Sequence, residues 1–98
     1  MDERLQQYAH AAIARLDHVL EHGAHVDHAE IQAATLAVIA FRDRALERHR
    51  EGTASDACLD GANALVSLAY GGEFPLSGLH RHRFEQTRDG MRALLDGA

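Results

Sequence analysis

The sequence has few of the residues that cross-link or interrupt a chain: one cysteine, one proline and no tryptophan among 98 residues. The lone Cys58 excludes an internal disulfide framework and is compatible with a reducing compartment. The scarcity of proline and aromatic residues, beside abundant alanine and leucine, favours helices over strands. These absences exclude a disulfide-rich secreted scaffold and indicate a small helical protein.

Lysine is absent as well, because all ten basic residues are arginine, and the formal net charge is -5. A protein that binds nucleic acid by neutralising phosphates needs a positive surface, so we expect no nucleic-acid partner. The longest nearly apolar run, residues 33–41, is far too short to cross a bilayer, and the first residues lack the pattern of a secretory signal. We therefore expect a cytoplasmic protein without a membrane partner.

Apolar residues recur at helical spacing between capping residues, which predicts four helices at about 3–22, 28–49, 55–70 and 78–95. Gly23 is placed to end the first helix, and Asp27 with Glu30 has the spacing of a capping box at the start of the second. Ser55 is a favourable N-cap for the third, which residues 71–72 are expected to end. The chain is therefore predicted to be one all-α domain over residues 1–98, a small antiparallel bundle. The alternative merges or drops the third helix and leaves three.

The middle of the second predicted helix, residues 33–41, is apolar nearly all round. A helix with almost no polar face has to be buried on several sides, and a bundle this small leaves one side of each helix exposed. Pairing with a second copy would cover that side. We therefore expect a homodimer whose interface includes Leu36, Ile39 and Phe41.

Residues 17–28 contain four histidines, and two of them, His18 and His22, lie one helical turn apart on the face opposite the apolar stripe. His25 and His28 follow across the turn between the first two predicted helices. Imidazoles at this spacing chelate zinc or another divalent transition metal, and the four histidines are the candidate ligands. The competing interpretation is a polar, solvated helix face and loop. The Glu-x-x-His pairs of di-iron bundles and the His-Glu-x-x-His order of zinc proteases are absent.

No catalytic grouping or cofactor motif is recognisable, so the leading hypothesis is a non-enzymatic interaction or regulatory module that binds a protein partner and needs no cofactor. The first alternative is a metal-binding protein that uses the four histidines. The second is a small-ligand binder or enzyme with a pocket near His80, Tyr70 and Cys58.

Overall fold

Four helices make up the part of the chain that the computed structural model describes, residues 1–23, 26–72 and 79–97. They are α1 (Glu3–His22), α2 (His28–Arg50), α3 (Asp56–Gly72) and α4 (Leu79–Gly97). No strand occurs within these ranges. The prediction of an all-α four-helix bundle is confirmed, and the three-helix alternative is excluded.

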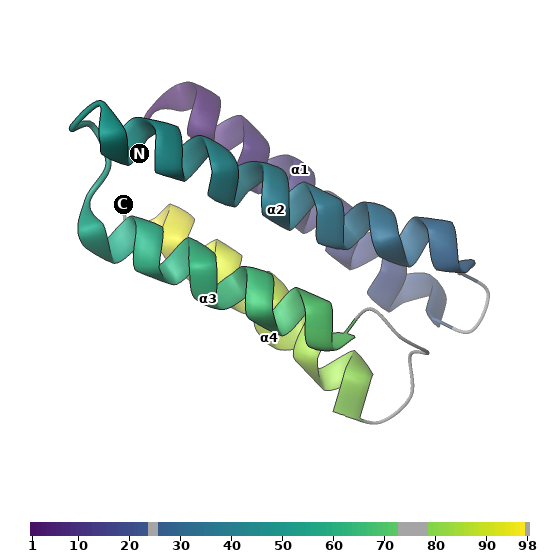
Figure 1. Ribbon diagram of the computed structural model, residues 1–98. Coiled ribbons are helices and arrows are strands. Elements are labelled where there is room, and N and C mark those ends of the chain that lie inside the picture. The colour runs from purple at the N-terminus through teal and green to yellow at the C-terminus, as the bar shows by residue number, and fades with distance from the viewer. Residues whose placement is uncertain (24–25, 73–78, 98) are drawn as a thin grey trace.

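The four helices run antiparallel along the long axis of a molecule that measures 41 × 20 × 20 Å. Figure 1 shows them as two hairpins, α1 with α2 and α3 with α4, with both chain termini at the same end. Each helix packs against two neighbours: α1 and α3 both contact α2 and α4. A helix of 23 residues is about 35 Å long, so α2 extends along most of the molecule. No helix among the described residues has the length and apolar character needed to cross a membrane.

The helix ends follow from side-chain caps. Asp2, Asp27 and Ser55 each accept a hydrogen bond from the backbone N–H three residues later, at 2.8, 3.0 and 3.1 Å. These bonds satisfy N–H groups that have no partner within the helix. Gly23 ends α1 with a φ of 44°, a conformation that favours glycine. The predicted caps at Gly23, Asp27 and Ser55 are therefore confirmed.

The core is a single cluster of apolar side chains that come from all four helices. Phe41 of α2 and Phe84 of α4 are its largest members, and neither is exposed at all. The other large members are smaller aliphatic side chains and one methionine: Leu5, Leu16, Val19, Val38 and Met91. Burial of such side chains is the main term that favours the folded state.

The α3 helix continues through Gly72, two residues beyond the predicted end. Gly71 and Gly72, the residues expected to end the helix, form its last two positions and do not adopt the positive φ of a C-cap glycine. A Cβ at Gly72 would overlap the ring of Phe84, and one at Gly90 would lie 2.5 Å from Cδ2 of Leu65. Glycine at these positions lets α3 and α4 approach closely, so its role is in packing.

Candidate functional site

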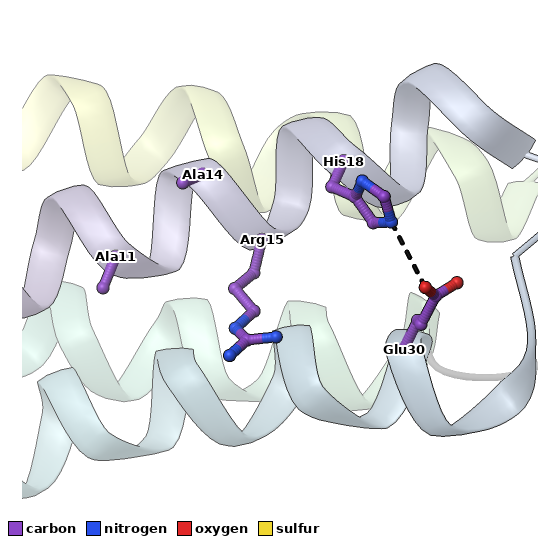
Figure 2. Close-up of a pocket in the computed structure, with 5 residues that line it drawn as sticks. All are labelled: Ala11, Ala14, Arg15, His18 and Glu30. Carbon is purple, nitrogen blue, oxygen red and sulfur yellow. Dashed lines mark hydrogen bonds and ion pairs between the residues drawn. The ribbon is translucent and has the colours of Figure 1, made fainter.

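A shallow, open pocket of about 460 Å³ lies in the groove between α1 and α2. Figure 2 shows that Ala11, Ala14, Arg15 and His18 of α1 line it together with Glu30 of α2. The two alanines leave the space, because their side chains end at Cβ. The site thus has an apolar floor and a polar rim.

The rim is closed at one end by an interaction between the two helices. Nε2 of His18 lies 3.4 Å from Oε1 of Glu30, and the two side chains are 50% and 46% exposed. A long, solvated pair of this kind adds little to stability. Its consequence is positional: an imidazole from α1 and a carboxylate from α2 lie together at the pocket mouth (Figure 2).

His22 lies beside His18 one turn further along α1. The ring centroids are 4.6 Å apart and the ring planes are inclined by 52°. Both histidines are exposed, as the helical spacing predicted. The structure therefore places two imidazoles side by side on α1, and one of them, His18, beside a carboxylate of α2.

Two further histidines complete the predicted set of metal ligands. His25 lies outside the residues that the structure describes, and His28 is the exposed first residue of α2. Within the described ranges, no three His, Cys, Asp or Glu side chains are gathered in an arrangement that could hold a metal ion. The described members of the predicted four-histidine set thus do not form a ready-made site.

Glu30 is the rim residue that the sequence analysis missed as a potential ligand. Its backbone N–H donates to the Asp27 cap, while its carboxylate contacts His18. In the antiparallel hairpin, residues 18 and 30 lie at the same height. Pairing the two predicted helices in this way could have identified Glu30 as a neighbour of His18.

The predicted interface on α2 divides into exposed and buried parts. Leu36 is 56% exposed, whereas Phe41 is fully buried in the core and Ile39 packs partly against the core. The assignment of Phe41 to an interface was wrong. Five residues along a helix correspond to a rotation of about 140°, so Phe41 faces inward where Leu36 faces outward.

Tyr70 of α3 lies at the same height as Leu36. Nη1 of Arg42 donates to the side chain of Asn63 at 3.3 Å, and His49 contacts Asp56, which fixes the antiparallel register of α2 and α3. Continuing this register sets residue 36 level with residues 69–70. Tyr70 is 53% exposed. The two most exposed large apolar side chains of the described chain therefore lie at one height on adjacent helices.

His80, Tyr70 and Cys58 do not share a pocket. Cys58 and Tyr70 are twelve residues apart on α3, a separation of about 18 Å along the axis. His80 donates from Nδ1 to the carbonyl oxygen of Gly71 at 2.9 Å and so helps to cap α3. Cys58 is half-buried beside Leu94 in a separate cavity of about 170 Å³, and burial raises the pKa of its thiol. The arrangement does not support the predicted pocket.

Several arginines are used within the bundle. Nη2 of Arg81 donates to the carbonyl oxygen of Leu20 at 2.7 Å, close to the end of α1. Arg88 and Arg92 of α4 lie 3.7 and 3.0 Å from the carboxylate of Asp17 on α1. These contacts join α4 to α1. The charges of Arg88 and Arg92 are balanced by Asp17, so these arginines do not form a basic docking patch.

Comparison of the chain with protein-family models, with curated proteins and with solved structures gives no match. The surfaces of the bundle are therefore the basis on which its function can be inferred.

Proposed function

We propose that this protein is a non-enzymatic interaction module of the cytoplasm, and that the outer face of α2 binds a second copy of the chain. The observation that carries the proposal is the exposure of Leu36, at 56%, near the middle of α2. Tyr70 flanks it on the α3 side, and the alanine-floored pocket lies on the α1 side. Together, Leu36 and the aromatic ring of Tyr70 offer apolar area that a partner can bury at the centre of an interface.

The residues around Leu36 favour a helix as the contacting element. Ala29, Ala33 and Ala40 follow the same helical stripe as Leu36, and their small side chains let a second helix approach closely. In a two-fold dimer the same patch is used on both copies. An antiparallel crossing of two α2 helices at Leu36 would place each leucine against the alanines of the partner.

The charges on α2 are compatible with that crossing. Asp43 is the first acid on the outer face after Leu36, seven residues away. In an antiparallel pair centred on Leu36, the two Asp43 side chains would be about 21 Å apart along the axis. This exceeds the Debye length of about 8 Å at physiological salt, so their repulsion is largely screened.

Sedimentation velocity over about 5–200 µM protein tests the proposal, because this range covers weak homodimers. We expect the wild-type protein to associate reversibly and Leu36→Asp to remain monomeric, since two carboxylates would meet at the symmetry axis. Ala64→Asp is the matched control. It adds the same charge at an exposed site about 120° around α3 from Tyr70 and should associate like the wild type.

Far-UV circular dichroism establishes that both variants keep their helices. The proposal is wrong if the wild-type protein stays monomeric over the whole range. It is also wrong if folded Leu36→Asp associates as strongly as the control.

A further inference from the structure

We propose that the pocket between α1 and α2 is completed by the second copy of the chain, whose Tyr8 enters the pocket and whose Arg4 pairs with Glu30. This inference rests on the proposed dimer and assigns the residues that the dimer uses beside Leu36. Each dimer would contain the contact twice, because a two-fold interface uses the same residues on both copies.

The register of the α1–α2 hairpin places Tyr8 on one side of Leu36 and the pocket on the other. His18 and Glu30 lie level with each other, so Tyr8, ten residues before His18, lies level with Ala40, ten residues after Glu30. Tyr8 and Ala40 line one hollow, which agrees with this register. Ala40 is about 6 Å beyond Leu36 along α2, and Glu30 is about 9 Å before it.

A two-fold axis at Leu36 brings these two features together. The axis that relates two antiparallel helices runs across them, so the α1 side of one copy lies over the α1 side of the other. It also exchanges positions at equal distances before and after Leu36. The partner's Tyr8 is therefore carried to a level about 6 Å before Leu36. This level lies between Arg15 and Glu30, which both line the pocket (Figure 2).

The chemistry of the pocket suits a tyrosine side chain. Tyr8 is 37% exposed, and its hydroxyl has no hydrogen-bond partner among the described residues. Ala11 and Ala14 form an apolar floor for the ring, while the exposed Arg15 makes no ion pair within the described ranges and can stack on the ring face. Tyrosine is enriched in interfaces because its ring buries apolar area while its hydroxyl reaches a polar rim.

The charges on the two sides of this contact are complementary. Arg4 is exposed, has no ion pair in the part of the chain that the structure describes, and lies level with Arg44, about 12 Å beyond Leu36. The axis carries it to within about 3 Å of the level of the partner's Glu30, an offset that a long arginine side chain spans. The Glu30 carboxylate is 46% exposed and free to accept a charge-assisted hydrogen bond from a guanidinium group.

Sedimentation velocity over about 5–200 µM, the range that covers weak homodimers, gives the dimer dissociation constant of each variant. Tyr8→Ala removes the ring and Ala14→Trp fills the pocket, and each should weaken association about tenfold or more, since the dimer loses two equivalent contacts. The matched controls are His10→Ala, which removes an exposed ring from the other side of α1, and Ala64→Trp, which adds the same bulk at an exposed site of α3. Both controls should associate like the wild type.

A charge exchange tests the pairing of Arg4 with Glu30. Arg4→Glu and Glu30→Arg each set two like charges against each other, so each should weaken association about fivefold or more. The double variant Arg4→Glu/Glu30→Arg restores opposite charges at both contacts and should recover the wild-type dissociation constant within about twofold. Far-UV circular dichroism establishes that every variant keeps its helices.

The outcomes separate this inference from the proposed function. If the wild type associates, Leu36→Asp is monomeric, and folded Tyr8→Ala and Ala14→Trp associate like their controls, the dimer stands and the docking of Tyr8 is wrong. If the charge exchange does not recover association that the single variants lose, the pairing of Arg4 with Glu30 is wrong. A wild-type protein that stays monomeric over the whole range overturns both the dimer and this contact.

Discussion

Replacing Gly72 by alanine is a small change that tests how tightly α3 and α4 pack against each other. Alanine at this position adds one methyl group, which would overlap the ring of Phe84, a side chain with no exposed surface. Adding a methyl group to a filled core costs typically about 1–3 kcal/mol. The higher helix propensity of alanine offsets at most about 1 kcal/mol, and less at the last residue of a helix. We therefore expect Gly72→Ala to lower the free energy of unfolding by about 1–2 kcal/mol.

Gly71→Ala is the matched control, since it makes the same change one residue earlier. Its new methyl group would meet the far end of the Arg83 side chain, which is only partly buried and can move aside. We expect this variant to be as stable as the wild type or slightly more stable.

Urea unfolding followed by circular dichroism at 222 nm measures both variants. Thermal unfolding gives a second estimate, since 1 kcal/mol corresponds to about 4–8 °C in a domain of this size. If Gly72→Ala matched Gly71→Ala in unfolding free energy, with equal denaturant slopes, the close contact between α3 and the Phe84 ring would not be the reason for glycine at position 72.

Three further predictions concern single polar groups. The buried hydroxyl of Thr35 has no hydrogen-bond partner among the described residues, whereas that of Thr87 donates to the carbonyl oxygen of Arg83 at 2.8 Å. Thr35→Val should therefore raise the unfolding free energy by about 1 kcal/mol and Thr87→Val should not, and equal effects in urea would contradict this reasoning. The hydrogen bond from the backbone N–H of Leu5 at the α1 cap, together with nearby arginines, lowers the pKa of Asp2 below 3.8. The stabilisation that the Asp2 carboxylate gives to the folded protein is therefore complete above that pH, and it is lost as the pH falls through the lowered pKa. Asp2→Asn should flatten the fall in thermal midpoint below pH 4, and an unchanged acid profile would argue against this role. Because burial raises the pKa of the Cys58 thiol, iodoacetamide should modify it more slowly in the native protein than in urea, and equal rates would show that the thiol is accessible.

The helices could be predicted because their signals are local. The caps at Asp27 and Ser55 and the end of α1 at Gly23 depend on residues within one turn of each other. The two glycines at the end of α3 were also expected to end it, but the reason for glycine at residue 72 lies on α4. That contact joins residues twelve positions apart across a connection, and no local pattern contains it.

The candidate sites divide in the same way. The proximity of His18 and His22 follows from helix geometry alone, and the structure agrees with it. The partnership of His18 with Glu30 depends on how the hairpin closes, so the sequence offered Glu30 only as part of a cap. The apolar run on α2 correctly marked Leu36 as exposed surface, but it did not separate Leu36 from Phe41. The two residues differ because Phe41 lies on the side of α2 that faces the core, whereas Leu36 lies on the opposite side.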